Sequence, residues 1–340
     1  MELNGGYVLL PQPIEDAACR LLKEKELPVV EAENPKRETV APLMKNARAI
    51  VLRTGITMDE ELLLQADDLI TISRTGGGVD NVDLDTATKR GIIVTSSLGV
   101  NTGSVVEHCC ALILSLFKQL FLLDRETKAG NFRVRYRNEP ADLMGKTAGV
   151  IGFGRIGSGL AKILHDPFGM EILAYDEYLP EGKKKEYAGW VSFVPLEELF
   201  TRADVVSLHL PLTGETKGLV GKRYLSMMKP SAFIVNSSRG GVIVENDLVQ
   251  ALEQNRIKGA GLDVFEHEPP AEDSPILRCR NVICTPHSAA LTAECVVRMA
   301  TSAVQRIIEV LEGYIPESIA NPQVLQNPRW KSLKKKRPLD

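Results

Sequence analysis

Three side chains of complementary chemistry, Arg239, Glu268 and His287, each follow a short apolar run in the second half of the chain. If these runs are parallel strands, their carboxyl ends meet at the sheet edge where open α/β proteins bind ligands. Histidine transfers protons near neutral pH, and a guanidinium can grip a carboxylate with two hydrogen bonds. A glutamate beside an imidazole favours its protonated form. The set predicts proton transfer to a substrate that carries a carboxylate, such as a 2-oxo acid.

Each of these residues also has a plainer interpretation. An arginine at a strand end is often part of a surface ion pair, and an isolated histidine is often structural. Glu266 and His267 lie in the same segment as Glu268 and compete with it for a role. Three such residues after successive strands favour a catalytic set.

The strongest local motif is Gly-Phe-Gly-Arg-Ile-Gly at residues 152–157, between a predicted strand and a predicted helix. In a dinucleotide-binding turn, Gly152 permits the tight bend, Gly154 lets a pyrophosphate approach, and Gly157 lets the helix contact the strand. The amides at the helix start then face the phosphate charge. Asp176 ends the next predicted strand, about 20 residues on, where a carboxylate accepts hydrogen bonds from the ribose 2′-hydroxyl. Because no arginine adjoins Asp176, NAD is predicted rather than NADP.

The order of apolar runs predicts an α/β fold with two doubly wound parallel sheets. Strand-like runs alternate with helix-like segments on both sides of the long helical pattern at residues 101–130, and another helix is predicted at residues 292–312. A buried packing face is the preferred interpretation of the 101–130 helix, with a symmetric partner chain as the alternative. The predicted strands occupy residues 7–10, 49–52, 69–73, 92–94, 148–152, 171–175, 205–208, 233–236, 261–264 and 282–284.

Composition is ordinary for a globular protein. The 340 residues are 44% hydrophobic and carry a formal net charge of −3, which gives no electrostatic reason to expect nucleic acid or membrane binding. The six cysteines show neither Cys-x-x-Cys pairing nor zinc-ligand spacing, so no metal is predicted. With no signal peptide in the sequence, we expect a soluble cytoplasmic protein. The basic segment at residues 331–340 is predicted to be a solvated tail.

Taken together, the motifs resemble those of the D-isomer-specific 2-hydroxyacid dehydrogenases, over residues 49 to 325 or so, with a pattern close to the 3-phosphoglycerate dehydrogenase-like branch. The motifs that carry the resemblance lie at residues 73–83, 152–157, 176, 209–213, 236–241, 263–269 and 286–290.

The resemblance implies specific roles. His287 would be the acid/base, Arg239 would bind substrate, and Glu268 would support His287. It also implies a Rossmann NAD domain at residues 102–292, a smaller flavodoxin-like substrate domain at residues 1–101 and 293–330, and a homodimer. The implied NAD-binding residues are Gly152, Gly154, Arg155, Ile156, Gly157, Asp176, His209, Pro211, Ser237 and Asp263.

The first part of the chain offers a candidate substrate loop. Gly76 and Gly77 let backbone amides approach an anion. Arg53 and Arg74 resemble the phosphate-binding arginines of 3-phosphoglycerate dehydrogenases, and Asn101 matches an asparagine of those enzymes. The alternative is that both arginines neutralise surface acids.

The expected function is therefore an NAD-dependent dehydrogenase that moves a hydride between NAD(H) and a D-2-hydroxy acid or 2-oxo acid, with 3-phosphoglycerate favoured. D-lactate and glyoxylate or hydroxypyruvate are alternative substrates. A rival of another class is an NAD-sensing corepressor, since such relatives keep the three catalytic-type residues. A formate-dehydrogenase-like enzyme fits less well, because formate oxidation needs no proton transfer by a Glu268–His287 pair.

Overall fold

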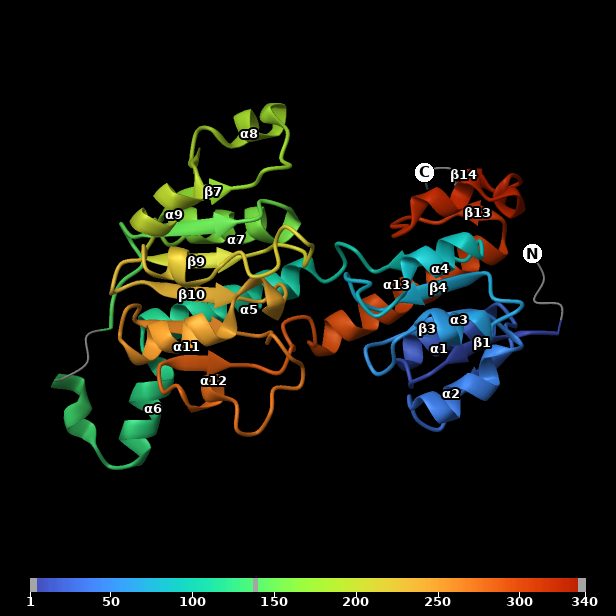
Figure 1. Ribbon diagram of the computed structural model, residues 1–340, viewed down its shortest axis with the longest axis horizontal. Coiled ribbons are helices and arrows are strands. Elements are labelled where there is room, and N and C mark those ends of the chain that lie inside the picture. Colours follow the sequence, from blue (N-terminus) through green and yellow to red (C-terminus); the bar gives the residue numbers. More distant parts are fainter. Residues whose placement is uncertain (1–4, 137–139, 336–340) are drawn as a thin grey trace. The chain divides into compact units, whose positions relative to one another are not determined.

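The computed structural model describes residues 5–136 and 140–335. The described chain divides into two compact units, each built on its own parallel sheet (Figure 1). Unit 1 holds the residues up to Asn101 together with those from Leu291 onward, and unit 2 runs from Thr102 to Ala290. Unit 1 is thus assembled from two separated stretches of the chain.

The sheet of unit 1 has the order β2-β1-β3-β4-β5 with every pair parallel, which is the flavodoxin-like order. Apolar side chains of α1 and α13 cover one face, and those of α2, α3 and α4 cover the other. The strands are β1 (Tyr7–Leu10), β2 (Val29–Glu31), β3 (Ala47–Leu52), β4 (Thr71–Arg74) and β5 (Ile93–Ser96). The helices are α1 (Asp16–Glu24), α2 (Arg37–Met44), α3 (Glu60–Leu64), α4 (Leu84–Lys89) and α13 (Ala293–Leu311).

The sheet of unit 2 has the order β12-β11-β10-β9-β6-β7-β8, again parallel throughout. The order reverses between β6 and β9, which is the switch point where open α/β sheets bind ligands. The predicted fold class is confirmed, although β8 was not predicted and β11 begins two residues earlier than predicted. The strands are β6 (Thr147–Ile151), β7 (Glu171–Tyr175), β8 (Val191–Phe193), β9 (Val205–Leu208), β10 (Phe233–Asn236), β11 (Gly259–Leu262) and β12 (Val282–Cys284).

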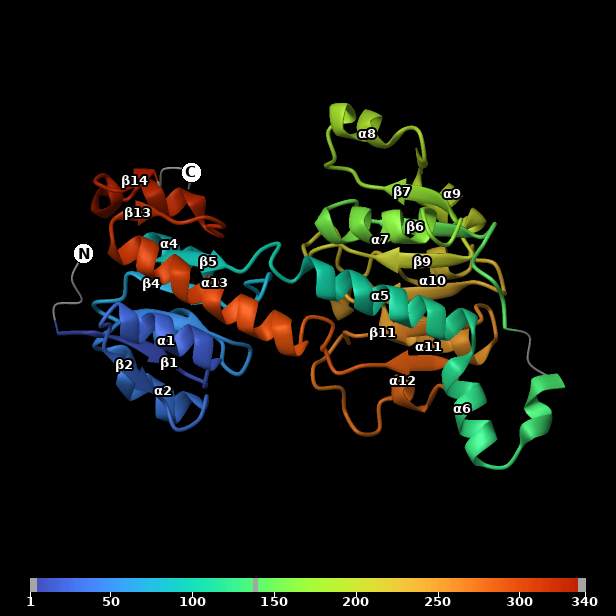
Figure 2. The same ribbon diagram turned by 180° about the vertical axis from the view of Figure 1, so that it is seen from behind.

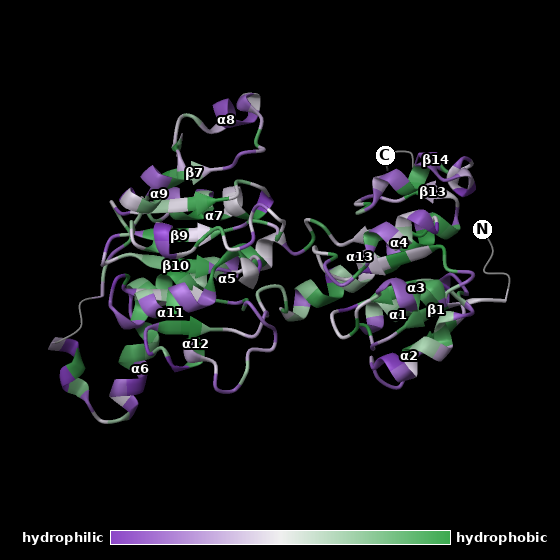
Figure 3. Cartoon of the chain, viewed as in Figure 1, coloured by the Kyte–Doolittle hydropathy of each residue, from purple (hydrophilic) through white to green (hydrophobic). Residues whose placement is uncertain are grey.

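Helices cover both faces of this second sheet. Helices α5 and α7 lie over one face (Figure 2) and pack apolar residues on it, and apolar residues of α9, α10 and α11 cover the other. Figure 3 shows the resulting division between apolar strands and polar outer helices such as α8. The helices are α5 (Thr102–Phe117), α6 (Leu120–Lys128), α7 (Arg155–His165), α8 (Glu181–Tyr187), α9 (Leu196–Arg202), α10 (Lys222–Leu225), α11 (Glu245–Glu253) and α12 (Pro275–Arg278), with 3-10 turns η1 (Phe132–Tyr136) and η2 (Gly240–Val242).

The single helix predicted at residues 101–130 is wrong in one respect. It is two helices, because Gln119 between α5 and α6 adopts a left-handed backbone with φ of 52°. Helix α6 has no buried residue, whereas α5 buries half of its length. Within the described chain no single helix is long and apolar enough to cross a membrane, and only the α5–α6 pair, bent by 59°, meets that criterion.

The segment predicted to be a solvated basic tail, from residue 331, exposes its described lysines but includes a short strand. Strand β14 (Lys334–Lys335) pairs with β13 (Tyr314–Ile315), and the Lys334 amide donates to the Gly313 carbonyl at 2.9 Å. Strand pairing uses backbone N–H and C=O groups, so it does not require the charged lysine side chains, which are exposed to solvent. The 3-10 turns η3 (Pro322–Gln326) and η4 (Pro328–Trp330) precede β14, and residues 336–340 lie outside the described residues.

One buried side chain joins the two stretches of unit 1. The Asn321 carboxamide accepts from the Val94 amide and donates to the Ile92 carbonyl, both at 2.9 Å, and donates to Thr88 Oγ1 at 3.0 Å. Asn321 therefore satisfies backbone groups of β5 and the preceding turn that no solvent reaches.

Replacing Asn321 with alanine should destabilise unit 1 without affecting unit 2. Two buried backbone groups would lose their partner, which costs about 3 kcal/mol in the free energy of unfolding. Urea unfolding followed by circular dichroism measures this loss. The matched control is Asn131→Ala, whose exposed side chain donates to Glu126, and it should cost under about 0.5 kcal/mol. Equal losses in both variants would contradict the assigned role.

Candidate functional site

The glycine turn after β6 has the geometry that a dinucleotide-binding loop requires. Gly152 has a φ of 87°, and a Cβ there would lie 2.5 Å from the His209 carbonyl oxygen. A Cβ on Gly157 would lie 2.0 Å from the Gly152 carbonyl oxygen. A side chain at Gly152 would push away the segment after β9, and one at Gly157 would push helix α7 away from the turn, so each glycine is required by a contact in the structure.

The middle glycine of the turn faces open space. No heavy atom lies within 4 Å of the position that a Cβ of Gly154 would take, and Gly154 is the residue that caps the start of α7. Amides at a helix start bind phosphate, so this open cradle fits the pyrophosphate of NAD. Arg155 and Ile156 form the first turn of α7, beside the cradle.

Asp176 follows β7, as predicted, and its carboxylate is fixed by the backbone. One oxygen accepts from the Phe153 amide at 2.7 Å, and the other accepts from the Tyr178 and Leu179 amides at 3.0 Å. The first of these hydrogen bonds ties Asp176 to the glycine turn. A carboxylate at this point fits a ribose with free hydroxyls and repels a 2′-phosphate.

The other predicted NAD-binding residues also lie after strands of unit 2. His209 follows β9, and burial lowers the pKa of its imidazole to about 4, so the ring is neutral and pairs with Ser207 Oγ at 2.9 Å. The Pro211 carbonyl accepts from Thr216. Ser237 follows β10, with its Oγ 2.8 Å from the sulfur of Cys109 on α5.

The three predicted catalytic residues come together in unit 2. His287 Nδ1 lies 2.7 Å from Glu268 Oε2. Burial raises the pKa of the Glu268 carboxyl, but hydrogen bonds from His287 and the Phe265 amide, with the charges of His287 and Arg239, outweigh it and leave that pKa below its usual range. Glu268 is therefore an ionised acceptor, Nδ1 carries a proton, and Nε2 is the ring nitrogen turned to other partners.

The loops that carry Arg239 and Glu268 approach each other at a glycine. A Cβ on Gly240 would lie 1.8 Å from the Phe265 carbonyl oxygen, a contact only glycine permits. Arg239 Nη1 donates to the Ser238 carbonyl at 2.7 Å, which orients the guanidinium. This close approach explains why the charge of Arg239 acts on Glu268 although the two residues are far apart in the sequence.

His287 has a left-handed backbone conformation, with a φ of 51°, which residues other than glycine seldom adopt. Its amide donates to the Asp263 carbonyl at 2.8 Å. The Asp263 carboxylate, which has no solvent exposure, accepts from the Ser288 and Ala289 amides at 2.8 and 2.9 Å. Asp263 thus anchors the turn that presents His287; its predicted contact with NAD remains a prediction.

The predicted substrate residues form a second group, in unit 1, around an asparagine that the sequence analysis missed. Asn81 accepts from Arg74 Nε at 2.7 Å and donates to the Arg53 and Ile56 carbonyls at 2.9 Å. Asn81 lies in the motif at residues 73–83, so its position was noted but not its function. The Arg74 guanidinium crosses above Gly76, where a Cβ would lie 2.0 Å from Nη1.

The side chain of Arg53 pairs with an acid, as the alternative interpretation held. Its Nη1 lies 3.1 Å from Glu15 Oε1 and donates to the Pro13 carbonyl. Asn101, the last residue before unit 2, has its amide group 3.7 Å from the point where a Cβ of Gly77 would lie. Unit 1 therefore brings the loop glycines and Asn101 together, but Arg53 has part of its charge neutralised.

Two further residues near His287 carried no motif signal. His108 on α5 and Thr285 after β12 contact each other and Asp263. His108 and Thr285 are 177 positions apart in the sequence, so spacing along the chain does not predict the contact between their side chains. Among the residues that the structure describes, no group of three or more histidine, cysteine, aspartate or glutamate side chains is arranged to hold a metal ion.

Comparison with known proteins agrees with this geometry. Residues 110–289 match the family model described as "D-isomer specific 2-hydroxyacid dehydrogenase, NAD binding domain". A D-3-phosphoglycerate dehydrogenase of Archaeoglobus fulgidus is 36% identical over 90% of this chain, which spans only 57% of that relative's length. A glyoxylate reductase of Korarchaeum cryptofilum is 37% identical over 86% of this chain and 88% of its own.

A solved structure supports the same assignment. The D-lactate dehydrogenase of Aquifex aeolicus, complexed with NAD and lactic acid, superimposes with a TM-score of 0.82 at 30% identity, covering 94% of this chain and 98% of that one. The family model matches more than half of the chain, and its bounds enclose the glycine turn, Asp176 and the Arg239–Glu268–His287 set. The chain belongs to the D-isomer specific 2-hydroxyacid dehydrogenase family.

Proposed function

We propose that this protein is an NAD-dependent dehydrogenase of D-2-hydroxy acids, in which unit 2 binds NAD and unit 1 contributes substrate contacts. The observation that carries the proposal is the 2.7 Å contact of His287 Nδ1 with Glu268, beside Arg239 and on the same sheet edge as the glycine turn. A corepressor of this family would keep the same three residues, so turnover of a 2-oxo acid, and not this contact, distinguishes the enzyme from an NAD-sensing corepressor.

In this proposal each residue has one task during reduction of a 2-oxo acid. Arg239 binds the substrate carboxylate, and the protonated His287 gives its Nε2 proton to the carbonyl oxygen as that oxygen gains negative charge. Glu268 stabilises the protonated ring and holds its orientation. Bound NADH supplies the hydride that reduces the carbonyl carbon. The products are the 2-hydroxy acid and a neutral His287, which regains its proton from solvent.

The substrate is proposed to be a small 2-oxo acid, with phosphohydroxypyruvate, the 2-oxo form of 3-phosphoglycerate, first. Two observations favour a substrate that carries a phosphate: the positively charged side chains of Arg53 and Arg74, and the similarity to relatives named D-3-phosphoglycerate dehydrogenase. The ion pair of Arg53 with Glu15 favours glyoxylate or hydroxypyruvate instead, and a glyoxylate reductase matches over most of both chains.

NADH oxidation with a panel of 2-oxo acids tests the function and orders the substrates. We expect turnover with at least one of phosphohydroxypyruvate, hydroxypyruvate, glyoxylate and pyruvate. His287→Ala should lower kcat at least about 1,000-fold while the NADH Kd changes less than about threefold, because only proton transfer is lost. Retained turnover in that variant would contradict the role of His287. Bound NADH without turnover across the panel would favour the corepressor.

Replacing Glu268 with glutamine should move the pH profile of reduction. Because the pKa of Glu268 lies below its usual range, its carboxyl group stays negatively charged at neutral pH. The charge disappears only when the pH falls through this lowered pKa. The single carbonyl oxygen of a glutamine can accept the hydrogen bond from His287 Nδ1, but the hydrogen bond from the Phe265 amide is lost, and so is the charge that stabilises the protonated His287. We expect kcat to fall about tenfold at pH 7 and the activity maximum to move about one unit toward acid. An unchanged maximum would contradict the charge effect.

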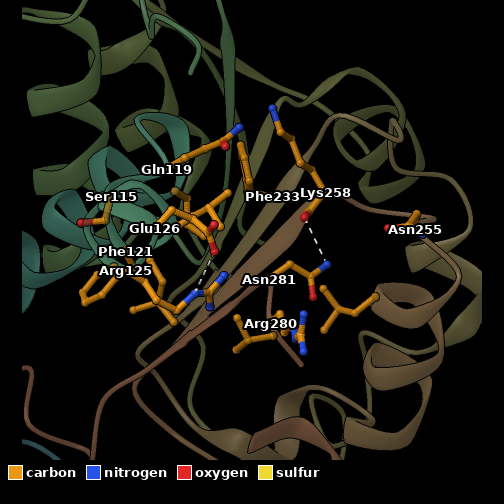
Figure 4. A pocket seen from close by; sticks show the side chains of 15 residues that line it. Ser115, Gln119, Phe121, Arg125, Glu126, Phe233, Asn255, Lys258, Arg280 and Asn281 are labelled. Carbon is orange, nitrogen blue, oxygen red and sulfur yellow. Dashed lines mark hydrogen bonds and ion pairs between the residues drawn. The ribbon is translucent and has the colours of Figure 1, made fainter. Parts of the chain in front are cut away.

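We also propose that the protein is a homodimer joined through unit 2. A pocket of about 580 Å³ lies at the amino ends of β10 and β12, where Phe121, Arg125 and Glu126 of α6 face Lys258 and Asn281 (Figure 4). The adjoining segment exposes apolar side chains that a monomer would leave in water. These side chains are Leu120, Phe121, Phe132, Tyr136 and Met144.

A second copy of the chain is the occupant that fits this surface. The apolar rim and the pocket adjoin each other, so in a two-fold dimer the rim of each copy can lie against the pocket of the other. The mixed charges of Arg125, Glu126 and Lys258 also suit a surface that contacts itself.

A reducing compartment such as the cytoplasm is proposed for the protein because all six cysteines are free thiols.

Replacing Phe121 with aspartate should convert the dimer to a monomer. Phe121 is 61% exposed in the single chain, so its loss leaves the fold intact, whereas a buried carboxylate would weaken association by about 3 kcal/mol, or roughly 100-fold. Light scattering coupled to gel filtration measures the mass. The control is Leu64→Asp on α3, where the side chain is 56% exposed, and it should remain dimeric. A monomeric wild type would refute the dimer.

A further inference from the structure

Helix α5 places a histidine against the segment that carries His287. His108, with a side chain 21% exposed, lies with Nε2 3.0 Å from Thr285 Oγ1 and 3.6 Å from Asp263 Oδ1. The chain passes from β12 through Thr285 to His287 within two residues. A side chain from α5 therefore contacts the base of the turn that presents the proposed acid/base.

The hydrogen bonds of Thr285 determine which ring nitrogen of His108 carries a proton. Thr285 Oγ1 lies 2.6 Å from Asp263 Oδ1, and an ionised carboxylate can only accept, so the single hydroxyl proton goes to Asp263. Thr285 Oγ1 then has only lone pairs to offer His108. Nε2 of His108 must be the donor, which makes a directed series of hydrogen bonds from His108 through Thr285 to Asp263.

This series ends on the group that fixes the backbone around His287. The Asp263 carboxylate accepts from the Ser288 and Ala289 amides, and its carbonyl accepts from the His287 amide. His287 itself has the left-handed φ of 51°, which persists only where surrounding contacts hold it. Any movement of the Asp263 carboxylate would be transmitted to His287 through the two neighbouring amides.

We propose that His108 is a positioning residue, which holds Thr285 and the buried Asp263 carboxylate by its Nε2 proton and thereby fixes the ring of His287 toward substrate. The inference rests on the proposed function, because it assigns His108 a task in that reaction. Helix α5 suits this task, since the next residue, Cys109, contacts Ser237 after β10. One rigid helix thus contacts the segments after both β10 and β12.

A spectroscopic test does not depend on turnover. With ¹³C-labelled histidine, the chain gives five ring signals, and His287→Gln identifies the one that belongs to His287. We expect His108→Ala to shift or broaden the His287 signal, and His108→Gln to restore it, because the glutamine amide can place a donor where Nε2 was. The control is His165→Gln on α7, whose Nδ1 pairs with the Met170 carbonyl near the amino end of β7, and it should leave the His287 signal unchanged.

Kinetics of the same variants then separate positioning from general stability. His108→Ala should lower kcat at least tenfold while KM for NADH stays within twofold, and His108→Gln should recover kcat to within threefold of wild type. Thr285→Val should reproduce the loss, and the double variant should be no worse than either single one, because both interrupt one series.

An unchanged His287 signal in His108→Ala, a glutamine variant as impaired as alanine, or additive losses with Thr285→Val would overturn the positioning role. A wild type that turns over no 2-oxo acid would refute the proposed function alone, and the His287 signal would still decide whether His108 positions that ring.

Discussion

A carboxylate with no access to solvent, that of Asp263, organises the loops at the carboxyl edge of the unit 2 sheet. Moving an ionised carboxylate out of water costs several kcal/mol unless hydrogen bonds replace its hydration. For Asp263 those bonds come from the Thr285 hydroxyl and from the Ser288 and Ala289 amides. The residues that donate these hydrogen bonds are sequence neighbours of His287. The hydrogen bonds that stabilise the buried carboxylate of Asp263 therefore also fix the position of His287.

The second constraint is the close spacing of loops at the carboxyl ends of parallel strands. Neighbouring strands bring Arg239, Glu268 and His287 to one edge, and the loops of Arg239 and Glu268 approach each other because Gly240 lets the chain lie against the Phe265 carbonyl. The glycine turn uses the same device, since Gly157 lies against the Gly152 carbonyl. In both places the absence of a Cβ lets two segments of backbone approach closely. This approach positions the Arg239 loop at Gly240 and the start of helix α7 at Gly157.

The sequence supported these conclusions unevenly. The fold class, the glycine turn and the Arg239–Glu268–His287 set could be predicted, because parallel strands bring sequence-distant residues to one edge by a general rule. The break at Gln119 could not, since a left-handed residue in an apolar helical pattern leaves no periodic signal. His108 and Asn81 were missed for another reason. Their roles depend on hydrogen bonds to particular atoms of distant residues, and spacing along the chain carries no information about those atoms.

Charge balance in unit 1 bears on substrate choice. Arg53 has the Glu15 carboxylate as an anionic partner at 3.1 Å, so part of its positive charge is already neutralised. Arg74 Nε donates a hydrogen bond to the Asn81 side chain. Under the proposed function, a phosphate bound by Arg53 would have to compete with the Glu15 carboxylate, a cost that a 2-oxo acid without a phosphate does not meet. Glu15 would therefore lower the advantage of a phosphorylated substrate over an unphosphorylated one.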